Sequence, residues 1–141
     1  MRNIYFAGVC ALLLSACAAT NQNFPQGYID LIGDKEAVLG YWVTDKMVAP
    51  SYPITAAKKR MSGCVEFSLV IGSNGKAVAP KIIKSFPEGV FHAEASKAIK
   101  KWSWQPTPSN LDKKPVSTTI QLDFFVEDSA NRKNAYQACK I

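Results

Sequence analysis

Histidine is almost absent from this sequence, and its scarcity excludes several kinds of chemistry. The single histidine, His92, has no partner at the spacing of metal ligands. No serine, cysteine or paired carboxylate is placed to work with His92 as a general base. We therefore expect a non-enzymatic protein without a metal or cofactor, and we interpret His92 as a surface residue.

Long hydrophobic runs are missing as well. The apolar run from Ile4 to Leu14 holds 11 residues, whereas a membrane-spanning helix needs about 20. Arg2 precedes the run and small residues follow it, a layout typical of a secretory signal peptide. The residues from Leu14 to Cys17 resemble a bacterial lipobox, which implies cleavage after Ala16 and a lipid on Cys17. A secreted protein with a coincidental cysteine is the alternative.

Cleavage at this point leaves 125 of the 141 residues, enough for one modest domain and a tether. Loss of Arg2 leaves 16 of the 17 basic residues against 11 acidic ones, a net charge of +5. Such a surface suits anionic lipid headgroups or peptidoglycan, and the export signal argues against nucleic acid as a partner. Ala18 resembles the sorting signal for the outer membrane. We expect a lipid-anchored envelope protein at that membrane, facing the periplasm.

The chain divides into four expected parts. Residues 1–16 are the signal peptide, 17–47 a tether with an N-terminal extension, 48–128 the folded domain and 129–141 a C-terminal tail. Residues 31–48 are too apolar for a free linker, so we expect them to pack on the domain in a conformation that the sequence does not assign.

The four cysteines separate by position. Cys10 leaves with the signal peptide and Cys17 carries the lipid, so Cys64 and Cys139 remain. An even pair in an exported protein is most simply a disulfide, although two separate buried thiols are the alternative. In the chain-entropy model, closing a loop of this length stabilises the fold by about 4 kcal/mol.

Alternating apolar residues predict three strands. The clearest covers 64–71, where every second residue from Val65 is apolar. Asn74 and Gly75 predict a hairpin turn into a return strand over 76–84. Pro80 lacks a ladder donor, so this return strand belongs at a sheet edge. The last strand covers 116–126.

Helical spacing appears before the first predicted strand and between the second and third. Residues 54–61 form a short helix, which Gly63 ends by a left-handed conformation. Residues 89–102 form a second helix, and the tail after residue 129 is weakly helical.

A right-handed crossover from the second strand carries the third to the far side of the first. We therefore predict an α+β fold with a three-stranded antiparallel sheet of order 2-1-3 and helices on one face. A disulfide to Cys139 draws the tail across the other face, where it shields Phe125.

Four motifs in this order resemble the C-terminal domain of TonB. They are a Tyr-Pro pair at Tyr52, a glycine that opens a strand at Gly63, the hairpin glycine Gly75, and Trp-Ser-Trp-Gln-Pro from Trp102. The likeness covers roughly residues 48 to 127. Energy-transducing members also carry a transmembrane helix and a long proline-rich spacer, and neither occurs here. The resemblance therefore implies a lipid-anchored binding module.

The resemblance also implies a site and a partner. Members of the family grip an extended peptide of an outer-membrane, TonB-dependent transporter, and an open sheet edge can accept such a peptide as an added strand. Because Pro80 has no backbone N–H to donate, the second strand is a poor edge for an added strand. The last strand therefore offers the usable edge. The residues expected to bind the envelope protein are Thr119, Ile120, Gln121, Leu122 and Asp123.

Several alternatives stay open at this point. The protein could instead be a structural envelope lipoprotein that self-associates as a homodimer or contacts the cell wall, and an envelope enzyme or enzyme inhibitor is the least supported hypothesis. Trp102 and Trp104 either stack on a ligand or lock the helix exit against the sheet. Residues 31–48 could occupy the edge of the last strand and close it.

Overall fold

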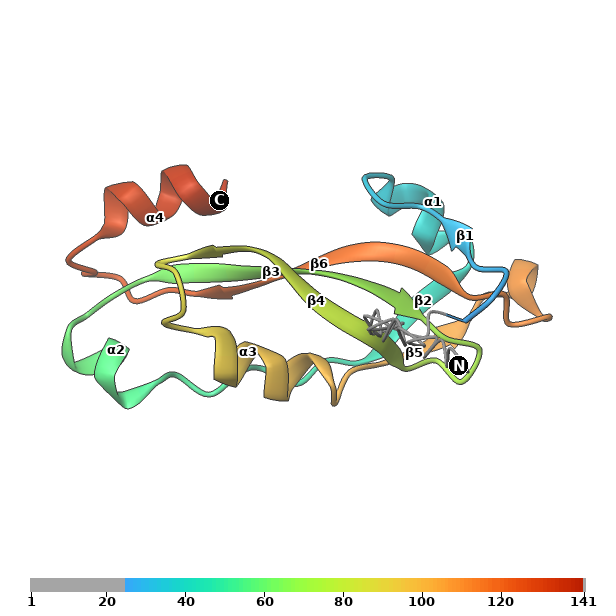
Figure 1. The fold of residues 1–141 in the computed structure, drawn as a ribbon, viewed down its shortest axis with the longest axis horizontal. Helices are drawn as coiled ribbons and strands as arrows, with labels where there is room; N and C mark the ends of the chain where they lie inside the picture. The colour runs from blue at the N-terminus through green and yellow to red at the C-terminus, as the bar shows by residue number, and fades with distance from the viewer. Residues whose placement is uncertain (1–24, 141) are drawn as a thin grey trace, which may run out of the picture.

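A long curled sheet with helices on both faces dominates the computed structural model, which describes residues 25–140 (Figure 1). Cys17 and the expected signal peptide, residues 1–16, lie outside the described residues. The main sheet has the strand order β1-β6-β3-β4, and a second sheet pairs β2 with β5. The strands are β1 (Ile29–Asp30), β2 (Trp42–Lys46), β3 (Gly63–Ile71), β4 (Ala77–Phe86), β5 (Ser103–Pro106) and β6 (Val116–Phe124). The helices are α1 (Lys35–Leu39), α2 (Ile54–Lys58), α3 (His92–Ile99), the 3-10 helix η1 (Pro108–Asn110) and α4 (Arg132–Cys139).

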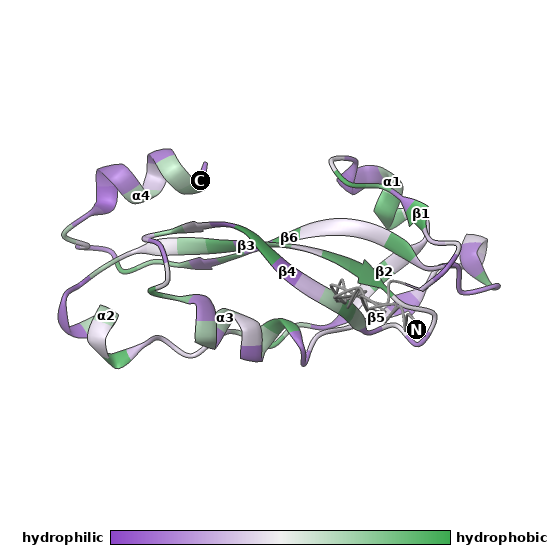
Figure 2. Cartoon of the chain, in the orientation of Figure 1, coloured by the Kyte–Doolittle hydropathy of each residue, from purple (hydrophilic) through white to green (hydrophobic). Residues whose placement is uncertain are grey.

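The core lies between β3 and the helices α2 and α3. The apolar residues at every second position of β3 from Val65 are at most 1% exposed, as the alternation predicts. Tyr52, Phe91 and Phe124 pack their rings together, with centroids of Phe91 and Phe124 4.3 Å apart. Figure 2 shows hydrophobic residues along β3 and hydrophilic ones over much of α4. Burial of one face of the sheet therefore holds the domain together.

The sheet differs from the predicted one in two ways. The order β6-β3-β4 is the predicted 2-1-3, but β1 adds a fourth strand parallel to β6, so the sheet is mixed. The strand β1 was not predicted because two residues are too few to show a period. The sequence around it instead predicts a flexible tether. The helices also cover both faces, because α4 lies opposite α2 and α3 (Figure 1), while Val38 of α1 packs into the core. The prediction of a three-stranded, fully antiparallel sheet with helices on one face was therefore wrong in these points.

The second sheet gives structure to the segment that the sequence left unassigned. Trp42 of β2 pairs with Pro106 of β5, is 1% exposed, and donates from its indole nitrogen to the Lys114 carbonyl at 2.9 Å. The hairpin after β3 packs against β5, because the Trp104 amide donates to the Gly75 carbonyl at 2.9 Å. Gly75 has φ +67°, and an added Cβ would lie 2.1 Å from the Trp104 carbonyl oxygen. The hairpin glycine thus serves both the turn and the contact between the two sheets.

Gly63 opens a strand, as the family resemblance implies, but it does not end the preceding helix in a left-handed conformation. The helix α2 ends at Lys58, and Arg60, with φ +49°, takes the left-handed conformation. Gly63 instead begins β3 where the chain passes closest to its neighbours. An added Cβ would lie 1.8 Å from the Phe86 carbonyl oxygen and 2.7 Å from Cε2 of Phe91.

The C-terminal tail crosses the other face of the sheet. Cys64 and Cys139 form the predicted disulfide, and both are at most 1% exposed. The helix α4 packs on β3 and β4, and its Tyr136 ring lies edge-on to Phe125 with centroids 5.3 Å apart. The tail therefore covers the face that α2 and α3 leave open.

We predict that Gly63→Ala destabilises the protein by about 3 kcal/mol, because the new methyl group overlaps a backbone carbonyl that cannot move away. Chemical denaturation followed by tryptophan fluorescence measures the change. Gly40→Ala is the matched control, because Gly40 has φ −68° and its added Cβ meets only the Ala37 carbonyl, at 3.1 Å. We expect the control to change stability by less than about 1 kcal/mol. Equal effects of the two substitutions would contradict this account of Gly63.

Candidate functional site

The outer edge of β6 is the candidate site, and one hydrogen bond shows which of its groups face outward. The Ile29 amide of β1 donates to the Pro115 carbonyl at 2.9 Å, so the backbone of residue 115 points away from β3. Because backbone groups alternate between the two edges of a strand, Thr119, Gln121 and Asp123 also point their N–H and C=O groups outward. Within residues 25–140, no strand pairs with this edge beyond Ser117.

The pairing of β1 with β6 stops because side chains take over its hydrogen bonds. The Leu31 amide donates to the Ser117 hydroxyl at 3.1 Å, and that hydroxyl donates to the Asp30 carboxylate. Asp30 also accepts from the Ile32 amide at 3.2 Å, which turns the chain away from the edge. The bond from Ser117, with help from the Ile32 amide, lowers the pKa of the Asp30 carboxyl. The chain then enters α1, where Asp34 accepts from the Ala37 amide as the N-cap.

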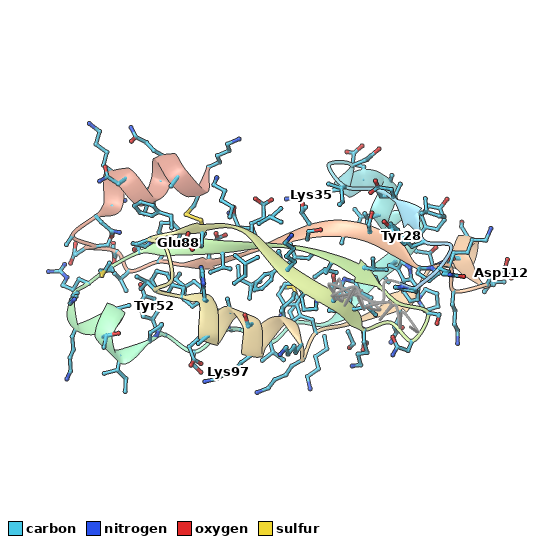
Figure 3. The ribbon with its side chains drawn as sticks, viewed as in Figure 1. Tyr28, Lys35, Tyr52, Glu88, Lys97 and Asp112 are labelled. Atoms are coloured by element: carbon cyan, nitrogen blue, oxygen red, sulfur yellow. A yellow bond between two sulfur atoms is a disulfide. The ribbon has the colours of Figure 1, made fainter. Side chains whose placement is uncertain are left out.

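Two hollows lie along this edge. The first has a volume of about 390 Å³ between β6, α1 and β2, and the second has about 360 Å³ between β6 and residues 47–50. Trp102, Gln121 and Asp123 line both hollows, so the two form one groove beside the outward-facing groups of β6. Lys35, the first residue of α1, lines the first hollow and is labelled beside β6 in Figure 3.

The two tryptophans of the Trp-Ser-Trp motif have different environments. Trp104 is 6% exposed and belongs to the core, in agreement with a packing role. Trp102 is half-buried and donates from its indole nitrogen to the Val48 carbonyl at 3.0 Å. That bond fixes Trp102 under the edge of β6, where its ring is available to a ligand in either hollow.

The side chains of Gln121 and Asp123 join the edge to the C-terminal helix. The Gln121 amide nitrogen donates to the Asp123 carboxylate at 2.9 Å and to the Cys139 carbonyl at 3.0 Å. Partial burial raises the pKa of the Asp123 carboxyl, while the Gln121 bond and the charge of Lys35 oppose that rise. These contacts lie on the α4 side of β6.

Only part of the predicted residue set has groups free for a partner. Thr119, Gln121 and Asp123 turn backbone groups outward, whereas Ile120 and Leu122 turn theirs toward β3 and their side chains toward the core. Sequence reasoning considered Trp102 as a ligand contact but missed the wall of the groove that Leu39 and Met47 form. The apolar content of residues 31–48 was the available signal.

The region around His92 is a separate surface cluster. The His92 ring nitrogen Nε2 lies 2.7 Å from the Ser85 hydroxyl and 3.5 Å from the Glu88 carboxylate, and it accepts from the Gly89 amide at 3.3 Å. None of these residues lines either hollow of the groove. Among residues 25–140, no group of three or more His, Cys, Asp or Glu side chains could hold a metal ion. No helix of that part of the chain has the length and hydropathy to cross a bilayer.

Comparison with known families decides the identity of the domain. The family model described as Gram-negative bacterial TonB protein C-terminal matches residues 48–125, which is more than half of the chain. The chain belongs to the TonB C-terminal family. This family consists of non-enzymatic binding domains, which confirms the prediction that the protein is not an enzyme.

The solved structure of one TonB C-terminal domain supports the fold. The solution NMR structure of the Pseudomonas aeruginosa TonB CTD is 26% identical, with a TM-score of 0.52, and the match covers 62% of this chain and 88% of that one. The TonB2 protein from Vibrio anguillarum is 24% identical, with a TM-score of 0.46, over 91% of this chain and 100% of that one. No curated protein matches the chain. The elements β1, α1 and β2 precede the residues that the family model matches.

The alternation along β6 leads to a measurable pattern of hydrogen exchange. We predict that the amides of Thr119, Gln121 and Asp123 exchange on the order of 100-fold faster than those of Ile120 and Leu122, which β3 protects. Amide exchange followed by NMR on the full-length chain measures all five rates in one experiment. Equal protection of the two sets would mean that the outer edge of β6 is already paired.

Proposed function

We propose that this protein is a lipid-anchored, periplasm-facing module that grips an extended peptide of an outer-membrane, TonB-dependent transporter. The peptide adds a strand to β6 at residues 118–124. Residues 1–16 act as the signal peptide, Cys17 carries the lipid, and residues 18–28 tether the domain whose family match begins at residue 48.

The observation that carries this proposal is the outward-facing backbone of Thr119, Gln121 and Asp123, which no strand of residues 25–140 pairs, beside a largely apolar groove. Six main-chain groups face outward there, and a guest strand pairs with such groups whatever its sequence. The family match supports a transporter as the source of the guest. The opposite edge of the sheet, on β4, contains Pro80 and a register shift, which makes it a poor partner for a strand.

The length of the tether supports a partner in the same membrane. Pro25 follows Cys17 by eight positions, so a fully extended chain between them reaches at most about 28 Å. A domain fastened at Cys17 therefore stays close to the bilayer that carries its lipid. A guest peptide from a protein of that bilayer lies within its reach.

Photocrosslinking in cells tests the proposed edge. We predict that a photoreactive amino acid at position 121 captures a TonB-dependent transporter, whereas the same amino acid at position 133, on the exposed side of α4, does not. Thr119→Pro lowers the yield at least tenfold, because proline removes an outward donor without breaking a bond to β3. Thr119→Ala keeps that donor and leaves the yield within about twofold. Capture of a second copy of this chain alone would instead support self-association.

The anchor is tested separately. We predict that cells given an alkyne-bearing fatty acid label this protein, and that Cys17→Ala abolishes the label because the acylated thiol is lost. Cys10→Ala is the control and keeps the label, since Cys10 is removed with the signal peptide. In-gel fluorescence after click chemistry measures both. A labelled Cys17→Ala variant would contradict the anchor and leave the peptide-binding proposal to the crosslinking result.

A further inference from the structure

The elements that precede the family match form one wall of the groove. Leu39, at the end of α1, lines the first hollow, and Met47, just after β2, lines the second. The two side chains are 62% and 67% exposed, although both are large and apolar. Apolar side chains that gather beside a binding edge indicate a surface that a partner covers.

Trp102 lies where successive side chains of an added strand would enter the two hollows. A guest strand on β6 directs alternate side chains to the face on which Ile120 and Leu122 enter the core. Successive side chains on that face lie roughly 7 Å apart. Trp102 lines both hollows, so neighbouring side chains of this set enter the groove on either side of its ring.

The charges of the groove limit which side chains fit. Lys35 and Asp123 are the charged residues among those that line the two hollows, and the Lys35 charge acts on Asp123. The remaining lining is largely apolar, with tryptophan, leucine, valine and methionine side chains. A charged guest side chain directed into the groove would lose its hydration among largely apolar neighbours. An uncharged, apolar set matches this lining.

Resting on the strand addition proposed above, we infer that the N-terminal elements select the guest. Leu39 and Met47 favour an extended peptide with an apolar side chain at every second position, on the face that it shares with Ile120 and Leu122. The edge of β6 then provides affinity for any extended backbone, and the wall provides specificity.

Two synthetic peptides of matched shape test the inference. The first is acetyl-Gly-Val-Gln-Val-Gln-Val-Gly-amide, and the second carries threonine in place of each valine. Valine and threonine have the same branching, so a difference in affinity reports on apolar contact. With the full-length chain in nanodiscs, and empty nanodiscs as the blank, we expect the valine peptide to bind at least tenfold more tightly in an NMR titration.

Variants of the wall identify the selecting residues. Leu39→Ser combined with Met47→Ser reduces the preference for valine to about twofold, because the apolar contacts are lost while the backbone pairing stays. Both residues are exposed, so we expect the thermal stability to be unchanged. Leu111→Ser is the matched control, since Leu111 is 79% exposed and lines neither hollow. This control keeps the full preference.

The outcomes separate the two proposals. Equal binding of both peptides, with chemical-shift changes along residues 118–124, would overturn the inferred selectivity and leave strand addition intact. An unchanged preference in the double variant would overturn the assignment to Leu39 and Met47. Failure of both peptides to shift residues 118–124 would overturn strand addition and the selectivity with it.

Discussion

The uninterrupted register between β3 and β6 decides what this molecule can offer to a partner. All nine residues of β3 pair with β6, from Gly63 opposite Phe124 to Ile71 opposite Val116. Every second residue of β6 uses its backbone N–H and C=O groups to hydrogen-bond β3. The backbone groups of the residues between them therefore face outward. A bulge in this ladder would rotate part of the outward set into the sheet. The outward set of β6 therefore depends on the unbroken ladder with β3.

The sheet has one usable edge because the other is closed by several independent features. On β4, Pro80 lacks an amide hydrogen, Ala79 has φ +46°, and the pairing with β3 shifts register twice. Lys81 and Lys84 add charge along the same strand. Bulges, proline and lysine are the features by which exposed strands avoid unwanted pairing. On β6 the short strand β1 covers only the first two residues, so the protection there is partial and leaves a defined segment open.

The sequence predicts the strands in which apolar and polar residues alternate over many positions. It misses the strands that are too short to show this alternation. The alternation of β3, the Asn-Gly hairpin and the edge position of Pro80 led to the correct order of the three long strands. The strands β1, β2 and β5 have two, five and four residues, too few to show a pattern against the surrounding loops. Gly63 was assigned a left-handed conformation because a sequence does not distinguish a glycine required for φ from one required for space.

The candidate site also has one part that the sequence predicts and one part that it does not. Which strand offers an edge follows from topology, so the residues of β6 could be predicted from the strand order alone. The groove could not, because Leu39, Met47 and Trp102 come together only through the second sheet, and nothing local in the sequence marks that sheet.

The two faces of β6 differ in what they present to the guest strand proposed above. On one face, the disulfide fastens α4 to β3, and the Cys139 carbonyl accepts a hydrogen bond from Gln121. The side chains of Gln121 and Asp123 on that face are therefore engaged by the protein itself. On the other face, Ile120 and Leu122 enter the core and the hollows lie beside them. On one side, a strand added to this edge meets side chains whose hydrogen bonds are already made within the protein. On the other side, it meets an open apolar surface. Its sequence can therefore be distinguished mainly through the side chains that enter the groove.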